Sequence, residues 1–142
     1  MGTAAEAKDV QIAIGPFLYY SRAVDGRMLG AVCELPSLQS KPTLLTMQKL
    51  DRLLGYADSH QNGCTIYHAS DMCLRIQSDA SFNSRPKSRS VAGGFHYLGR
   101  FDDPGFFNAS IVNVCSIIPV VCGAVSEAEL AALYANGQVA VE

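Results

Sequence analysis

The sequence predicts an α+β domain that contains an antiparallel sheet, and three observations lead to this class. Apolar residues recur at helical spacing from Val10 to about His60. Beyond the turn dipeptide Asn62-Gly63 the pattern changes to the two-residue period of strands, and a second helical pattern runs from Ser126 to Asn136. Helices and strands that are segregated along a chain are typical of α+β proteins with antiparallel sheets.

The N-terminal part is expected to form three helices. Its apolar residues lie in three stretches, Ile12 to Val24, Met28 to Leu35 and Leu44 to Ala57, each with the spacing that lines one face of a helix. Gly26 and Pro36 separate these stretches. Because both residue types interrupt helices, we expect the chain to turn at each of them.

Four strands are expected after the Asn62-Gly63 turn, because β-forming residues alternate there with polar ones. The first two predicted strands form a hairpin, and the connection between the last two contains the turn residues Asp103-Pro104-Gly105. The four predicted strands are Cys64 to His68, Cys73 to Asp79, Val91 to Gly99 and Ala109 to Val121.

The last predicted element is a helix from Ser126 to Asn136, followed by Gly137 as the residue that ends it. Ser126 and Glu129 have the spacing of a capping box, in which the Glu side chain bonds back to the first backbone N–H of the helix. The order of elements is therefore three helices, four strands and one helix.

Composition indicates a globular protein, and we expect it to be intracellular. Its 142 residues suit one compact domain overall, with a helical segment over residues 1–62 and a mixed segment over residues 63–142. A net charge of −2 excludes nucleic-acid binding through a large excess of cations, so any such contact must be local.

Neither a membrane span nor a disulfide framework is expected. The longest apolar run, Val112 to Val125, is shorter than the roughly 20 residues that cross a bilayer, and the first ten residues lack the pattern of a secretory signal. The five cysteines lie at wide spacings among apolar neighbours, which indicates buried free thiols rather than disulfides or a zinc site.

A longer pattern occupies residues 76–99 and 125–137, which read IQSDASFNSRPKSRSVAGGFHYLG and VSEAELAALYANG. In order, it contains Asp79-Ala80-Ser81, Gly93-Gly94-Phe95 and Glu129-Leu130-Ala131-Ala132. This ordered set resembles the front half of the ribonuclease H domain of copia-type retrotransposons. In that family an Asp ends the first strand, the second strand is Gly-rich, and a Glu lies on the helix after the third strand.

The N-terminal half extends the resemblance. Residues 14–32 and 46–60 read IGPFLYYSRAVDGRMLGAV and TMQKLDRLLGYADSH. They are similar to the helical connection that precedes ribonuclease H in the same polyproteins. The resemblance thus covers about residues 10 to 142, and it implies a ribonuclease H-like fold that is truncated after its first helix.

The resemblance implies chemistry on the RNA strand of an RNA/DNA hybrid. Enzymes of this family cut it by attack of water on a phosphodiester, with two Mg²⁺ ions held by clustered carboxylates. The resemblance implies that Asp79 bridges the two ions and that Glu129 binds one of them. The family's next Asp lies on the strand after that helix, which corresponds to sequence beyond Glu142.

Simpler roles stay open for these residues. Glu129 also fits the capping box, and Asp79 also fits a turn residue at the end of a strand. Arg85, Lys87 and Arg89 form a basic loop that is expected at the same end of the sheet as Asp79. These cations are either contacts for hybrid phosphates or part of a solvated hairpin loop.

Two functions of different classes follow. The first is a retroelement-derived, ribonuclease H-like module that is catalytically incomplete and serves as a binding or structural component of a larger assembly. A protein partner or a second copy would then cover the exposed face or edge of the sheet. The second is a Mg²⁺-dependent endonuclease that cleaves RNA/DNA hybrids and is completed by sequence or by a partner beyond Glu142.

Overall fold

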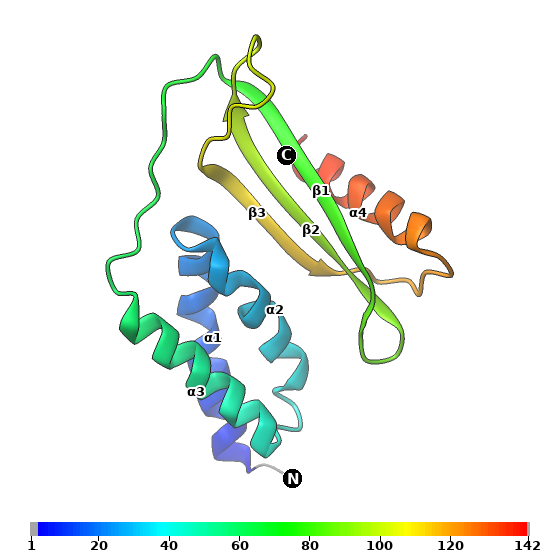
Figure 1. The fold of residues 1–142 in the computed structure, drawn as a ribbon. Coiled ribbons are helices and arrows are strands. Elements are labelled where there is room, and N and C mark those ends of the chain that lie inside the picture. Colours follow the sequence, from blue (N-terminus) through cyan, green and yellow to red (C-terminus); the bar gives the residue numbers. More distant parts are fainter. Residues whose placement is uncertain (1–2, 142) are drawn as a thin grey trace. The chain divides into compact units, whose positions relative to one another are not determined.

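A computed structural model describes residues 3–141, and the chain forms two compact units whose boundary lies between Thr65 and Ile66. The described part of the first unit is helical, and that of the second combines a three-stranded antiparallel sheet with a helix (Figure 1). The predicted α+β class is therefore confirmed. Within residues 3–141, no helix has the length and apolar character needed to span a bilayer.

Four helical elements form the N-terminal unit. They are α1 (Ala4–Ala23), η1 (Gly26–Met28), α2 (Leu29–Leu38) and α3 (Leu44–Ser59). The first helix begins earlier than predicted because Thr3 and Glu6 form a capping box, in which Thr3 Oγ1 accepts from the Glu6 N–H at 3.2 Å. Pro36 does not end the second helix but lies in its last turn.

The core of the N-terminal unit is built from the apolar faces of these helices. Its buried side chains are Val10, Ile14, Met28, Val32, Leu35, Leu50 and Leu53. Their spacing within each helix is the three- and four-residue repeat that the sequence predicts, but Ile12 and Leu44, which begin two of the predicted stretches, are exposed. The helices of this unit therefore depend on burial of one face, which is the usual source of helix stability in proteins.

The C-terminal unit contains a sheet in the order β1-β2-β3. Its elements are β1 (Cys73–Arg85), β2 (Arg89–Gly99), β3 (Ser110–Ile117) and α4 (Val125–Val139). Both strand pairs are antiparallel. The hairpin is formed by β1 and β2, which replace the hairpin predicted between residues 64–68 and 73–79.

The strand predicted at Cys64 to His68 does not form, and the bonds of His68 explain why. The side chain of Asn108 accepts from the His68 N–H at 2.9 Å and donates to the His68 carbonyl at 2.9 Å. Tyr67 in turn donates its hydroxyl to the Ser110 carbonyl at 3.0 Å. Side chains thus satisfy backbone groups that a neighbouring strand would otherwise bond.

The ends of three elements differ from the predicted ones. The first strand of the sheet continues past Asp79 to Arg85, because its ladder with β2 runs on into the hairpin. The last strand ends at Ile117, before Pro119, which has no N–H to donate to a ladder. Gly137 lies inside α4 rather than after it, and it does not have the positive φ of a helix-ending glycine.

The last helix lies across one face of the sheet, over β1 and β2 (Figure 1). Ala128 and Ala132 of α4 are fully buried and pack with Ala92 of β2, and Ala80 and Phe82 of β1 pack against the same cluster. Since alternate residues of a strand face opposite sides, this packing assigns the even-numbered residues of β1 around Ala80 to the face that α4 covers.

None of the five cysteines, all of which lie in the described residues, forms a disulfide, as predicted. Their burial differs from the prediction, because only Cys122 is buried, whereas Cys64 is exposed and Cys33, Cys73 and Cys115 are half-buried. The apolar neighbours of these residues in the sequence did not indicate which side of an element each one occupies.

Candidate functional site

Asp79 lies in the middle of β1, not at its end, and is exposed. It is paired in register with Gly93 of β2. Its neighbour Ser78 accepts a hydrogen bond from Asn136 of α4, and Ala80 packs against the alanines of that helix. Because its neighbours on both sides face α4, Asp79 points to the opposite face of the sheet.

Glu129 lies on α4 next to the buried Ala128 and is itself half-buried. Glu129 therefore lies on the side of the sheet that α4 covers, whereas Asp79 points to the other side. The structure does not bring the two carboxylates together, so they do not fit the paired ligands that two Mg²⁺ ions require. Within residues 3–141, no group of three or more His, Cys, Asp or Glu side chains is placed to hold a metal ion.

The capping alternative for Glu129 is wrong. The residue that precedes α4 is Ala124, and its side chain makes no capping bond. Instead, Glu127 folds back so that its Oε2 accepts from the Gly123 N–H at 2.6 Å. An acidic side chain at this place also interacts favourably with the positive end of the helix dipole. The cap was missed because α4 begins one residue before Ser126.

Arg85, Lys87 and Arg89 lie at the tip of the β1–β2 hairpin, where Arg85 and Arg89 are paired in register. Lys87 and Arg89 are exposed. The hairpin tip is six residues further along β1 than Asp79, which corresponds to at most about 20 Å at 3.3 Å per residue, because the strand is irregular between Ser81 and Arg85. The expectation that the basic loop and Asp79 share one end of the sheet is therefore wrong.

A buried polar cluster joins α4 to the sheet, and the sequence patterns did not predict it. Asn136 is fully buried, and the Ser78 hydroxyl, the Gly93 carbonyl and the Ala132 carbonyl lie 2.9–3.0 Å from its Nδ2 and share its two N–H donors. Its Oδ1 lies 2.9 Å from Nε2 of the buried His96. Since Oδ1 has no hydrogen, Nε2 of His96 is the donor in this bond.

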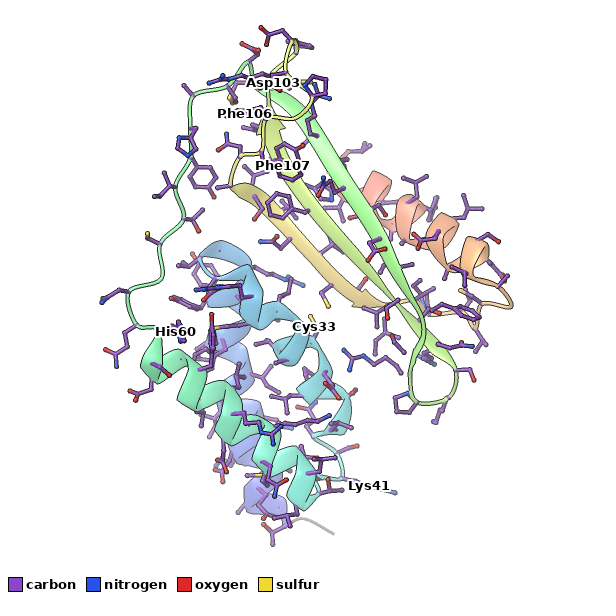
Figure 2. All side chains as sticks on the ribbon, viewed as in Figure 1. Cys33, Lys41, His60, Asp103, Phe106 and Phe107 are labelled. Carbon is purple, nitrogen blue, oxygen red and sulfur yellow. The ribbon has the colours of Figure 1, made fainter. Side chains whose placement is uncertain are left out.

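The face of the sheet opposite α4 carries an aromatic cluster at the end remote from the hairpin. The rings of Tyr97 and Phe107 stack with centroids 5.1 Å apart, and Phe95 lies 5.6 Å from Tyr97. Figure 2 shows Phe106 and Phe107 on the loop that leads from β2 to β3. The alternation of Phe95 and Tyr97 along β2 is the one sequence signal for this cluster.

Comparison with known proteins identifies no relative of this chain. No family model matches the sequence, and no match is found among the curated proteins or among the solved structures. The ribonuclease H resemblance therefore rests on the sequence pattern alone and stays a prediction.

Proposed function

We propose that this chain is a retroelement-derived, ribonuclease H-like module that acts inside the cell as a structural component of a larger assembly, and that it assembles by self-association through α4. The observation that carries the proposal is the apolar character of α4 on the side that faces away from the sheet.

The outer stripe of α4 consists of Leu130, Leu133, Tyr134 and Gly137, which have the i, i+3, i+4, i+7 spacing of one helix face. Leu130 and Tyr134 are each 67% exposed and Leu133 is 59% exposed, although Ala128 and Ala132 on the other side of the helix are fully buried. A helix that is apolar on both sides is typical of one with a partner on each side.

A second copy of the chain is the occupant that the charges favour. The outer stripe carries no charged residue, and α4 has its two acidic residues, Glu127 and Glu129, near its start. An antiparallel pair of α4 helices around a two-fold axis would keep the glutamates of the two copies at opposite ends. Gly137 leaves open space around its Cα, which permits close approach of a second helix.

Sedimentation velocity over a wide range of protein concentration tests this proposal. We expect the protein to form a dimer or larger species, and the double variant Leu130→Glu/Tyr134→Glu to stay monomeric, because it places charges in the interface. Leu45→Glu is the matched control, since Leu45 is 58% exposed on α3 of the other unit. A monomeric protein at all concentrations, or a dimer that survives the double substitution, would contradict self-association.

Catalysis is tested separately. The opposite orientation of Asp79 and Glu129 supports a module that does not cleave nucleic acid by itself, so we expect no Mg²⁺-dependent cut in a labelled RNA/DNA hybrid. The variant Asp79→Asn serves as the control for contaminating nuclease. Mg²⁺-dependent cleavage that is lost in Asp79→Asn would overturn this part of the proposal and favour the endonuclease.

Local binding of nucleic acid through the β1–β2 hairpin is a second candidate function. It is favoured by the three cations, Arg85, Lys87 and Arg89, within five residues at the hairpin tip. Binding there does not depend on the carboxylates, because the tip lies far from Asp79 along β1. Such contacts to phosphates hold a nucleic acid without reading its sequence.

A further inference from the structure

A groove between α2 and α3 in the N-terminal unit has the features of a small-molecule site. The two helices pack side by side (Figure 1), and the groove between them encloses about 270 Å³. This volume is close to the lower end, about 300 Å³, of the range of small-molecule pockets. The floor is apolar and is formed by Met28, Leu35 and Leu53.

Polar contacts between the helices close the groove at both ends. At one end, Lys49 Nζ of α3 lies 2.5 Å from Glu34 Oε1 of α2. At the other end, the Tyr56 hydroxyl of α3 donates to Asp25 at 3.2 Å, and the Arg27 guanidinium lies over the Tyr56 ring with 5.6 Å to its centroid. The two closures restrict the occupant to a short molecule, which excludes a long helix or a polynucleotide.

The middle of the groove is open because the α2 residue there is Ala31, which has no side chain beyond Cβ. The other helix contributes Arg52 and Leu53 at this level. Ala31 and Arg52 are both exposed, so a ligand has access from solvent. An alanine opposite an apolar floor leaves a space that a flat or branched apolar group can fill.

The charged residues that line the groove favour an anionic ligand. Arg27, Lys49 and Arg52 line the groove together with one acidic residue, Glu34. Arg27 is already engaged by Asp25, at 2.8 and 2.9 Å, and Lys49 by Glu34. Arg52 takes part neither in the ion pair of Arg27 with Asp25 nor in that of Lys49 with Glu34. The guanidinium of Arg52 is therefore the cation available to a ligand, and guanidinium groups bind carboxylates and phosphates by two parallel hydrogen bonds.

We propose that this groove binds a small amphipathic anion, whose apolar body lies on Leu35 and Leu53 and whose carboxylate or phosphate is held by Arg52. Affinity comes from burial of the ligand's own apolar surface against this floor, and the single available guanidinium fixes the orientation of the ligand. Lys49 lies one helical turn away from Arg52 on α3, but its charge is balanced by Glu34, so the anion is held by Arg52.

The probe for this site is 2-naphthoate, an apolar ring system with one carboxylate, and the readout is the change of amide chemical shifts in the full chain. We expect shifts that saturate and that concentrate around Ala31, Leu35 and Leu53. The neutral analogue 2-naphthamide is expected to bind at the same place about tenfold more weakly, because it lacks the charge-assisted bonds. The analogue 2-naphthyl phosphate distinguishes the two headgroups, and tighter binding than naphthoate would identify phosphate as the preferred one.

Three variants make the test specific. Arg52→Gln is expected to weaken naphthoate about tenfold and to leave naphthamide unchanged, and Ala31→Leu is expected to exclude both probes by filling the groove. Lys8→Gln removes an exposed cation of α1 and is expected to change nothing. Ala31 and Arg52 are exposed, so both variants should fold, which thermal unfolding checks. Shifts that map to α4 or to the sheet, equal naphthoate affinity in Arg52→Gln, or no saturable shift at all would overturn the proposal.

Discussion

The contact between Asn136 and Gly94 determines how closely α4 approaches the sheet. Asn136 has bonds to β1, to β2 and to its own helix, so its amide cannot move without losing several partners. A Cβ atom built on Gly94 would lie 1.7 Å from Oδ1 of Asn136 and 2.6 Å from its Cγ. Gly94 is therefore required by the close approach of a buried side chain, not by an unusual backbone conformation.

The variant Gly94→Ala is expected to destabilise the C-terminal unit by about 1–3 kcal/mol, because the added methyl group displaces Asn136 from its buried bonds. The protection of the β2 amides against hydrogen exchange measures this loss of stability in the C-terminal unit. Gly93→Ala is the matched control on the same strand, since the added atom would come no closer than 3.7 Å, to the Asp79 carbonyl oxygen, which is an ordinary van der Waals contact. Equal protection of β2 in Gly94→Ala and the unsubstituted protein would show that the cluster tolerates the methyl group.

Asp25 connects the short η1 turn to α3. Its carboxylate accepts two bonds from the Arg27 side chain and one from the Tyr56 hydroxyl. The hydrogen bond from Arg27 lowers the pKa of Asp25, and this outweighs the burial that acts in the opposite direction. Burial and the bond to Asp25 raise the pKa of Tyr56, so its phenol stays a donor at neutral pH.

The lowered pKa of Asp25 predicts that the N-terminal unit loses stability in acid. The folded pKa lies below the unfolded value of about 4, so the stabilisation is complete above about pH 5 and is lost as the pH falls through the folded pKa. Urea unfolding followed by α1 and α3 amide signals at a series of pH values measures this loss. In Asp25→Asn the loss should be smaller, whereas in Asp51→Asn, a substitution at an exposed site, it should persist. The same acid dependence in Asp25→Asn would assign the effect to other groups.

The helices were predicted more accurately than the strands because their signals are local. The apolar spacing of α3, from Leu44 to Leu53, is set by residues within a few turns of each other. In contrast, the backbone of His68 is satisfied by Asn108, forty residues away, and no pattern near His68 contains this information. The missing strand at residues 64–68 is therefore a consequence of a distant side chain.

The sequence patterns also did not predict the relative orientation of the two candidate carboxylates. The sequence placed Asp79 on a strand and Glu129 on the following helix, and both placements are correct. Whether the two side chains meet depends on which face of the sheet the helix covers. A shift of one residue in the register of a strand moves each of its side chains to the opposite face of the sheet. In β1, the packing of Ala80 and the bond from Asn136 to Ser78 determine which side chains face α4. The spacing of Asp79 and Glu129 in the sequence does not indicate which face of the sheet the helix covers.

The net charge of −2 limits how the protein can bind nucleic acid. Long-range attraction is absent at such a charge, so affinity depends on a local group of cations. The β1–β2 hairpin supplies such a group in Arg85, Lys87 and Arg89, on a chain with 11 Lys and Arg against 13 Asp and Glu. Three phosphate contacts at most are then expected from the hairpin.

This number of contacts predicts a weak salt dependence. For a labelled RNA/DNA hybrid, the slope of the logarithm of the binding constant against the logarithm of salt concentration should be no steeper than about −3, since each phosphate contact contributes about −0.7 to −0.9. Arg89→Ala should weaken binding and make the slope shallower by about one contact. Lys8→Ala, which removes an exposed cation from α1, should leave both quantities unchanged. A slope that Arg89→Ala does not alter would exclude the hairpin, because counterion release counts the cations that touch phosphate wherever they lie on the chain.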